Sequence, residues 1–280
     1  MIVDRYGEWC VLQTLSAGAE ACRDAIAQAI LDLARPRGIL ARNDPPVRAH
    51  EGLPRETVAL HGDVPREVEV REGPVRYRAL LWEGQKTGAF LDQRENRERA
   101  RSLARGRALD AFCYQGGFAL HLAAGGADEV VAVDSSAPAL EVGRANAALN
   151  GLEAKVRWVE ANAFDFLREE EARGARYDVI VLDPPALAKR REALDRALAA
   201  YKEINLRALR LLASGGHLLT SSCSYHVDRA RFLATLRAAA ADSGRRVRLC
   251  EWRGQAADHP EILTIPETAY LKTALLQVVD

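Results

Sequence analysis

The stretch RALDAFCYQGGFALHLAAGGADEVVAVD, residues 107–134, decides the fold class. Its periodicity predicts a β-strand over residues 107–114, a helix that starts at Gly116–Gly117 and runs through Ala124, and a second strand over residues 129–134. A helix that joins two such strands is typical of a β-α-β unit, in which the strands are parallel.

The same alternation continues along the rest of the chain. A nearly all-apolar strand such as YDVIVLD is expected where both faces of a parallel sheet are covered. The further expected strands are 155–160, 177–183, 217–222, 246–252 and 270–279, and the expected helices are 138–150 with Ser135 or Ser136 as N-cap, 164–173, 191–212 and 227–242. This α/β pattern predicts a doubly wound parallel sheet, which binds ligands beyond the carboxyl ends of its strands.

The first part of the chain follows a different pattern. A strand over residues 8–15 and a helix over residues 20–34 are followed by short segments separated by proline and glycine. Strands around one helix predict a small α+β domain. We place the domains at residues 1–90 and 91–280.

Composition restricts the kinds of partner. The chain has 39 Lys and Arg against 39 Asp and Glu, so its formal net charge is zero and it has no overall basic field to attract nucleic acid. RNA binding would need a local patch, such as RENRERAR over residues 94–101. On composition alone, that run is more typical of a solvated helix face that carries both signs of charge.

The five cysteines, Cys10, Cys22, Cys113, Cys223 and Cys250, form no C-x-x-C pair and no cluster with histidine at zinc spacing. We expect reduced thiols and no metal site. No segment approaches the roughly 20 apolar residues of a membrane span, so we expect a cytoplasmic protein without membrane contact.

Polar and glycine residues stand at the ends of the first two strands. Gly116 and Gly117 would let the backbone approach a ligand at a helix N-terminus, or serve only as a tight turn. Their spacing is not that of the dinucleotide fingerprint, which disfavours a nicotinamide enzyme. Asp134 could accept both hydroxyl protons of a ribose or cap a helix, and Asn162 could reach an adenine edge or form a turn.

The fourth and fifth strands of this domain end in LDPP and SSCS. Asp183 follows an apolar strand and precedes two prolines. Burial of its carboxylate would cost free energy unless the group lies in a cleft or is hydrogen-bonded. Cys223 follows the apolar run at 217–222, at the point where the chain leaves the sheet and side chains face a cleft. Because these strands commonly lie side by side, we expect Asp183 and Cys223 to face one pocket.

A thiol and a carboxyl group in one pocket suit methylation at carbon 5 of a cytosine. A thiolate that adds to carbon 6 makes carbon 5 nucleophilic, and a carboxyl group can stabilise the adduct through the ring nitrogen. Methylation of exocyclic amines often uses an aromatic residue after the two prolines, and Ala186 stands there. The alternative is an inert cysteine at the end of a strand.

Several motifs resemble one family. DAFCYQGGFALHLAAGGADEVVAVDSSAPALEVGRANAALNG, YDVIVLDPPALAK, YKEINLRALRLLASGGHLLTSSCS, QAADHPEILTIPETAYLK, DRYGEWCVLQTLSAGAE and KTGAFLDQRENR together are similar to the bacterial 23S ribosomal RNA 5-methylcytosine methyltransferases of the RlmI type. The resemblance runs from about residue 4 to residue 279.

The resemblance implies a class I methyltransferase fold, with a seven-stranded sheet whose last-added strand is antiparallel, S-adenosylmethionine as cofactor and RNA, 23S ribosomal RNA above all, as substrate. It implies Cys223 as nucleophile and Asp183 as the group that orients the cytosine. The implied cofactor residues are Asp110, Phe112, Tyr114, Gly116, Gly117, Asp134, Ser135, Asn162, Asp183, Gln93 and Arg94, and the implied substrate residues are Arg97, Pro184, Pro185 and His259. Glu267 shares a segment with His259 that could close over the substrate.

Two further expectations follow from the resemblance. Members of the family carry an N-terminal PUA domain that helps bind RNA, and we expect this chain to lack it. The small domain at residues 1–90, or a homodimer, would then contribute to RNA binding. The rival hypotheses are methylation of another RNA base or of a small molecule, and a catalytically idle module that binds RNA.

Overall fold

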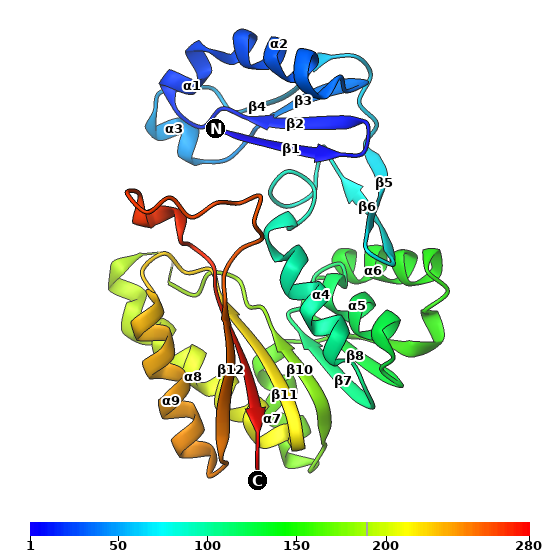
Figure 1. Ribbon diagram of the computed structural model, residues 1–280, viewed down its shortest axis with the longest axis vertical. Helices are drawn as coiled ribbons and strands as arrows, with labels where there is room; N and C mark the ends of the chain where they lie inside the picture. The colour runs from blue at the N-terminus through cyan, green and yellow to red at the C-terminus, as the bar shows by residue number, and fades with distance from the viewer. Residues whose placement is uncertain (189) are drawn as a thin grey trace. The chain divides into compact units, whose positions relative to one another are not determined.

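The structure is a computed structural model that describes residues 1–188 and 190–280 (Figure 1). Lys189, the last residue of the motif over residues 177–189, lies outside the described residues. The chain divides into two compact units, one of Met1–Glu72 with Arg76–Leu91 and one of Gly73–Val75 with Asp92–Asp280. All the strand-end residues named above belong to the second unit.

The first unit is built on a four-stranded sheet in the order β1-β2-β3-β4. Its elements are β1 (Ile2–Tyr6), β2 (Trp9–Gln13), α1 (Ala17–Ala21), α2 (Arg23–Ala34), β3 (Gly38–Asn43), α3 (Val47–His50), β4 (Glu56–His61) and the strands of a hairpin, β5 (Glu67–Glu72) and β6 (Val75–Leu80). The helix expected over residues 20–34 is divided at Cys22, which ends α1 and precedes α2. Ser16 starts α1 earlier than expected because its side chain accepts a hydrogen bond from the amide of Ala19.

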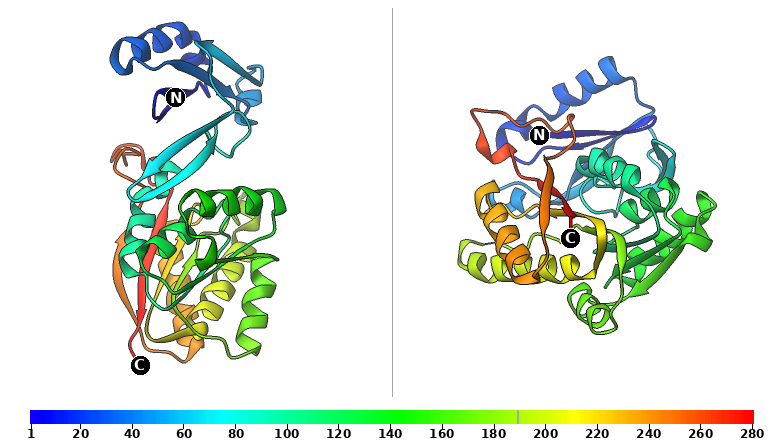
Figure 2. Two further views of the ribbon diagram at one scale, coloured as in Figure 1. Left: turned by 90° about the vertical axis from the view of Figure 1, so that its right-hand side faces the viewer. Right: turned by 60° about the horizontal axis from the view of Figure 1, so that its bottom comes forward.

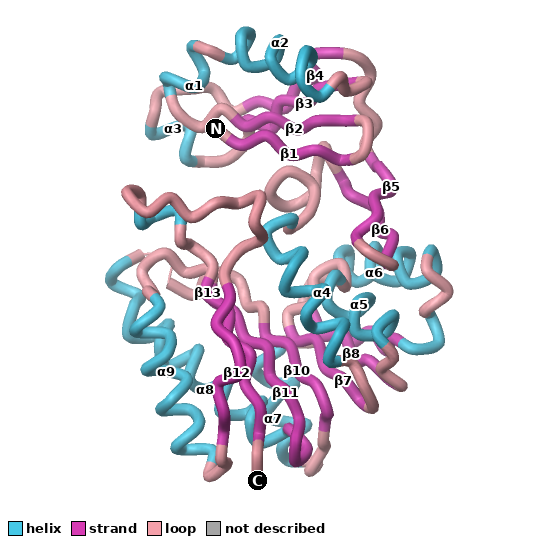
Figure 3. Tube along the Cα trace, viewed as in Figure 1, coloured by secondary structure: helices cyan, strands magenta, loops and turns pink. Residues whose placement is uncertain are grey.

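The second unit holds a seven-stranded sheet in the order β12-β13-β11-β10-β7-β8-β9 (Figure 3). The strands are β7 (Arg107–Ala111), β8 (Glu129–Asp134), β9 (Val156–Glu160), β10 (Tyr177–Leu182), β11 (Leu212–Ser222), β12 (Val247–Arg253) and β13 (Lys272–Val278). β13 pairs antiparallel with both β11 and β12, and the pairs from β11 to β9 are parallel. The predicted doubly wound sheet with an antiparallel last strand is confirmed.

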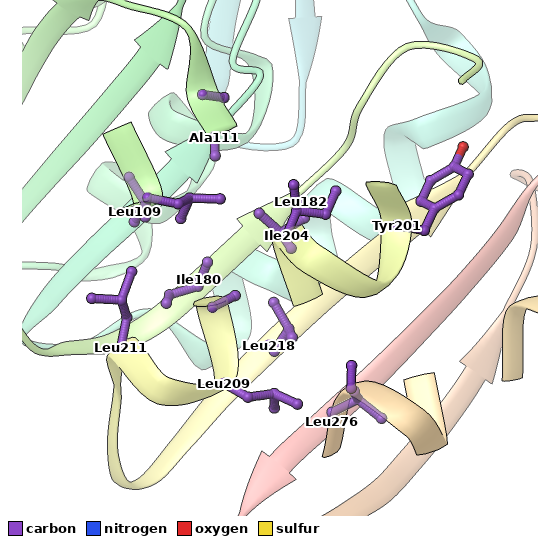
Figure 4. Packing of buried hydrophobic residues seen from close by; sticks show 14 of the residues in the cluster. Leu109, Ala111, Ile180, Leu182, Tyr201, Ile204, Leu209, Leu211, Leu218 and Leu276 are labelled. Carbon is purple, nitrogen blue, oxygen red and sulfur yellow. The ribbon is translucent and has the colours of Figure 1, made fainter. Parts of the chain in front are cut away.

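Helices cover both faces of this sheet (Figure 2). α4 (Arg94–Leu103), α5 (Gly117–Gly125) and α6 (Ala137–Leu149) pack on one face, and α7 (Ala163–Ala172), α8 (Leu194–Leu211) and α9 (Arg229–Ser243) pack on the other. Figure 4 shows part of the larger core, where Ile180 and Leu182 of β10 meet Ile204 of α8 and Leu218 of β11. Coverage of both faces explains why the residues of β10 are almost all apolar.

The start of β11 differs from the prediction. We expected a helix to Leu212 and a strand only from residue 217, whereas α8 ends at Leu211 and β11 begins at Leu212. Leu212 pairs with Tyr177, and the pairing then shifts so that His217 pairs with Val179. Gly215, at a φ of 73°, provides the left-handed conformation that this irregular segment needs.

The indole ring of Trp158, on β9, occupies space left by two glycines. A Cβ atom at Gly143 of α6 would lie 2.5 Å from the Trp158 ring, and one at Gly116 would lie 2.4 Å from it. Both distances are shorter than real contacts, so these positions must be glycine for the ring to fit. This packing holds the middle of β9 against α6 and the turn that follows β7.

We predict that Gly143→Ala destabilises the protein by about 1–3 kcal/mol, because overpacking against Trp158 outweighs the gain of about 1 kcal/mol that alanine normally brings to a helix. Urea unfolding measures the change. The control is the same substitution in a Trp158→Leu background, where the smaller side chain leaves room for the new methyl group. Equal costs in both backgrounds would contradict the packing argument.

Candidate functional site

The carboxyl ends of the parallel strands meet at one edge of the sheet. β7, β8, β9, β10 and β11 all run in the same direction, so the residues that follow them gather there. The predicted juxtaposition of the fourth and fifth strands of this domain is confirmed, because β10 and β11 are direct neighbours. This edge is the candidate site.

The turn after β7 has an uncommon backbone. Phe112 and Tyr114 have φ values of 69° and 49°, and Gly116, the N-cap of α5, has a φ of 81°. Positive φ costs a non-glycine residue conformational energy, and such residues gather at functional sites. Alternation of left-handed residues turns successive backbone N–H groups toward one side, which suits an anionic or polar ligand.

Asp134, at the end of β8, holds this turn in place. Its carboxylate accepts hydrogen bonds from the backbone amides of Tyr114, at 2.8 Å, and Ser136, at 2.9 Å. Each carboxylate oxygen has a second lone pair, so these bonds leave Asp134 able to accept hydroxyl donors as well. Ser136, rather than Ser135, is the N-cap of α6. Ser135 lies between Asp134 and Ser136 in the same turn.

Asp110 lies behind the turn. It is fully buried, and its Oδ2 accepts a hydrogen bond of 2.8 Å from the amide of Ala119, while its Oδ1 has no hydrogen-bond partner among the described residues. Burial raises the pKa of Asp110 well above its usual range. A buried acceptor without a partner costs free energy. A hydrogen-bond donor from a polar ligand, or protonation of the carboxylate, would relieve that cost.

Arg97 and Gly117 lie next to each other beside Asp110. The Arg97 side chain is 6% exposed, and a Cβ atom at Gly117 would lie 3.1 Å from its Cδ. The Arg97 charge partly opposes the rise in the pKa of Asp110. This position groups Arg97 with the turn after β7 rather than with an open surface, and its predicted contact with RNA stays a prediction.

Asn162 is the N-cap of α7. Its side-chain oxygen accepts a 2.9 Å hydrogen bond from the amide of Phe164, and the residue is exposed. The structure thus gives Asn162 the turn-forming role that the sequence left open. Its predicted contact with adenine stays a prediction. Phe164 in turn makes an edge-to-face contact with Phe112, at a ring-centroid distance of 5.9 Å.

Asp183 follows β10 and is oriented by a buried amide network. Gln93 donates from Nε2 to Asp183 Oδ1 at 2.8 Å, and Asn96 donates from Nδ2 to Gln93 Oε1 at 2.7 Å. Gln93 and Asn96 are almost fully buried. Because Gln93 offers its N–H to Asp183, the carboxyl group has a fixed orientation. Pro184 is buried and Pro185 is exposed.

Cys223 lies beside the loop that carries Asp183. Its Sγ is 4.0 Å from the carbonyl oxygen of Pro184, and the residue is partly exposed. Cys113 offers a contrast, because it is buried and burial raises its pKa well above the usual range. All five cysteines lie within the described residues and are free thiols. Cys223 is the partly exposed cysteine of this edge, and it follows β11, the direct neighbour of the strand that Asp183 follows.

The Ser224 cluster, formed by Ser224, Tyr201, Ala188 and Lys272, holds the two loops together. The Ser224 hydroxyl accepts from the amide of Ala188 at 3.0 Å and shares a 2.9 Å hydrogen bond with the Tyr201 hydroxyl. Lys272 Nζ donates to the carbonyl oxygens of Ser224 and Tyr270, both at 2.8 Å. The cluster therefore joins the loop after β10, the loop after β11, α8 and β13.

Sequence reasoning missed the roles of Tyr201, Ser224 and Lys272. Lys272 is 5% exposed at the start of a largely apolar strand, and that charge was the available signal. Burial lowers the pKa of Lys272, while the charges of Cys223 and Asp228 oppose the shift. The ammonium group therefore lies in the electrostatic environment of the Cys223 sulfur.

Arg94 and His259 share one carboxylate partner, Asp258. Arg94 forms a 2.8 Å ion pair with Asp258, whose other oxygen lies 2.9 Å from His259 Nδ1. Exposed pairs of this kind contribute little to stability. They join α4 to the segment of residues 255–271, which also carries Glu267. The structure thus joins Arg94 and His259 to each other.

The match to a family model decides the family. Residues 47–276 match the model of the S-adenosylmethionine-dependent methyltransferases. The chain belongs to this family. Its cofactor is S-adenosylmethionine.

Several curated relatives of this methyltransferase share one name, ribosomal RNA large subunit methyltransferase I. The relative from Aeromonas hydrophila is 44% identical over 276 residues, which cover 97% of this chain and 70% of the relative. The relative from Vibrio cholerae is 39% identical, over 96% of this chain and 69% of the relative. The predicted resemblance to the RlmI type is confirmed.

Solved structures match the fold of this methyltransferase. SMU.776, described as a methyltransferase and complexed with SAH, superposes with a TM-score of 0.85 at 22% identity, covering 99% of this chain and 71% of that one. A methyltransferase from Agrobacterium tumefaciens superposes with a TM-score of 0.70 at 21% identity, covering 99% and 86%. At these identities the likeness shows the fold.

Residues 1–188 and 190–280 contain neither a metal-binding cluster nor a membrane-spanning helix. Within these ranges no three His, Cys, Asp or Glu side chains are grouped so that they could hold a metal ion. The helices in the same ranges are too short or too polar to cross a membrane.

We predict that Ser224→Ala costs about 1–3 kcal/mol of stability, because it removes the hydroxyl to which the buried Ala188 amide donates and one of the hydrogen bonds of the Tyr201 hydroxyl. Hydrogen exchange should also become faster at the Ala188 amide. Ser221→Ala is the matched control, since Ser221 is equally buried and its hydroxyl bonds instead to that of Thr273 on β13. Equal effects on the Ala188 amide would contradict the role of the cluster.

Proposed function

We propose that this methyltransferase modifies carbon 5 of a cytosine in RNA, most directly large-subunit ribosomal RNA, through a covalent bond to Cys223. The observation that carries the proposal is the position of the Cys223 sulfur, partly exposed and 4.0 Å from the Pro184 carbonyl, beside the oriented carboxyl group of Asp183. The name shared by the curated relatives supports ribosomal RNA as the substrate.

The turn after β7 fits the cofactor. Asp110 has a buried oxygen without a partner among the described residues, the backbone of residues 112–116 is left-handed at three positions, and Asp134 can accept further hydrogen bonds. We assign the amino-acid portion of the cofactor to Asp110 and the turn, and the ribose to Asp134. When bound, S-adenosylmethionine supplies an electrophilic methyl group.

The remaining predicted residues surround this turn. We assign to the cofactor side Phe112, Tyr114, Gly116, Gly117, Ser135, Asn162, Gln93 and Arg94, and to the RNA side Arg97, Pro184, Pro185 and His259. Gln93 acts through Asp183, because its amide donates to the carboxyl group and holds its plane. Arg94 and His259 act together through Asp258.

Cys223 and Asp183 act on the base. Addition of the thiolate to carbon 6 forms a C–S bond and moves the electrons of the 5,6 double bond to carbon 5. Asp183 hydrogen-bonds the ring nitrogen and stabilises the charge of the adduct. After methylation, loss of the carbon-5 proton restores the double bond and expels the thiolate. The target base must be single-stranded or flipped out to reach both groups.

Cys223→Ala should abolish methylation, by about a thousandfold or more, and change cofactor affinity by no more than about threefold. Cys250→Ala, which removes an exposed thiol on β12, is the matched control and should be fully active. Methylation is measured as 5-methylcytosine by mass spectrometry of digested ribosomal RNA.

RNA that contains 5-fluorocytosine provides a second readout, because fluorine cannot leave as the proton does and the adduct should persist on the Cys223 peptide. A Cys223→Ala protein that still forms 5-methylcytosine would refute the proposal.

Lys272 should raise the thiolate population of Cys223 through its charge. We predict that Lys272→Met moves the acid limb of the pH–rate profile to higher pH by about one unit, because loss of a nearby cation disfavours the thiolate. Lys272→Arg should restore the wild-type limb. A Lys272→Met enzyme with lower activity but an unmoved profile would limit Lys272 to a structural role.

A further inference from the structure

A cavity adjoins the thiol loop, residues 223–228 between β11 and α9, and is lined by none of the residues assigned above to the cofactor or to RNA. The Tyr225 pocket has a volume of about 780 Å³ and lies between the loop that follows Cys223, the start of α9, the end of β12 and residues 266–272. In Figure 1 these segments neighbour one another at the N-terminal end of α9, directly after the thiol loop. Its volume is within the range of about 300–1,000 Å³ typical of ligand sites.

The lining of the Tyr225 pocket is basic although the chain is neutral. Five of its side chains are cationic, against three acidic ones, and the five are Arg191, Arg229, Arg231, Arg253 and Lys272. Arg231 pairs with Asp228, and Arg253 pairs with Glu251. A local excess of arginine suits phosphate groups.

Aromatic rings stand among these cations. Tyr225 is 63% exposed, and its ring makes an edge-to-face contact with His226 at a centroid distance of 5.2 Å. The Arg229 guanidinium lies over the Trp252 ring, 4.7 Å from its centroid. Exposed aromatic rings mixed with arginines are how proteins bind single-stranded nucleic acid, since the rings stack on bases and the cations contact phosphates.

The pocket is linked to the candidate site along the chain and through a hydrogen bond. Tyr225 is two residues after Cys223, and Lys272, which lines the pocket, donates to the carbonyl oxygen of Ser224 between them. A nucleotide in the pocket would therefore be a neighbour of a base held at Cys223. A flipped target base leaves its neighbours unstacked, and an aromatic platform can compensate for that loss.

We propose that the Tyr225 pocket binds the nucleotide next to the target cytosine in a single-stranded RNA, with its base on Tyr225 and His226 and its phosphates on Arg229 and Arg231. The inference rests on the proposed function, because it takes RNA as the substrate. An acidic peptide would satisfy the arginines but would leave the exposed rings without a role, so RNA is the occupant that accounts for both features.

Binding of a fluorescein-labelled single-stranded RNA of about twelve nucleotides, measured by anisotropy with S-adenosylhomocysteine present, tests the inference. Tyr225→Ala should weaken binding about tenfold, and Tyr225→Phe, which keeps the stacking face, should match the wild type. Arg229→Ala/Arg231→Ala should flatten the dependence of log Kd on log salt by about 0.7 for each phosphate that is no longer neutralised. Arg237→Ala, an exposed arginine on α9 outside the pocket, is the control and should change neither value.

The outcomes separate this inference from the proposed function. If the wild type methylates RNA through Cys223 while Tyr225→Ala and the double arginine variant bind RNA as the wild type does, the pocket inference is wrong and the proposed function stands. If a poly-glutamate peptide competes with the labelled RNA as strongly as unlabelled RNA does, the occupant is an acidic peptide and the inference is also wrong. If Tyr225→Ala and the double arginine variant bind RNA more weakly while Cys223→Ala remains fully active, the pocket inference is supported and only the covalent mechanism is refuted.

Discussion

The parallel pairing of β10 with β11 is the constraint on which the candidate site depends. Leu182 lies opposite Thr220 in this pair, so both strands end at the same edge of the sheet. Asp183 and Cys223 follow directly, and the hydroxyl of Ser224 holds the two loops through Ala188 and Tyr201. A thiol and a carboxyl group can act on one base only if both reach it, and this pairing brings them to one place.

Much of this arrangement follows from local patterns in the sequence. The strand at residues 129–134 has the same bounds in the structure as in the prediction, because its apolar run is bounded by charged residues. Asp134, Asp183 and Cys223 could be found for a related reason. Each is a polar residue at the end of an apolar strand or directly after it, and the alternation of strands and helices predicts where those strands end.

The contacts of the site could not be predicted in the same way. Gln93 and Asp183 are 90 residues apart, and Lys272 and Ser224 are 48 apart, so their hydrogen bonds depend on tertiary structure. The burial of Arg97 beside Gly117 and the early start of β11 also depend on distant neighbours. The family resemblance supplied the names of Gln93 and Arg97. Their partners came from the structure.

The place of β13 has a consequence for biosynthesis. This strand lies inside the sheet, between β11 and β12, although it comes after both in the chain. On the ribosome, β11 keeps an open edge until residues 272–278 have emerged, and an open edge invites pairing with other chains. Lys272 belongs to the same strand, so the pairing of β13 with β11 also brings the ammonium group into the surroundings of the thiol. The nascent chain therefore acquires the electrostatic environment of Cys223 only after residues 272–278 have been synthesised.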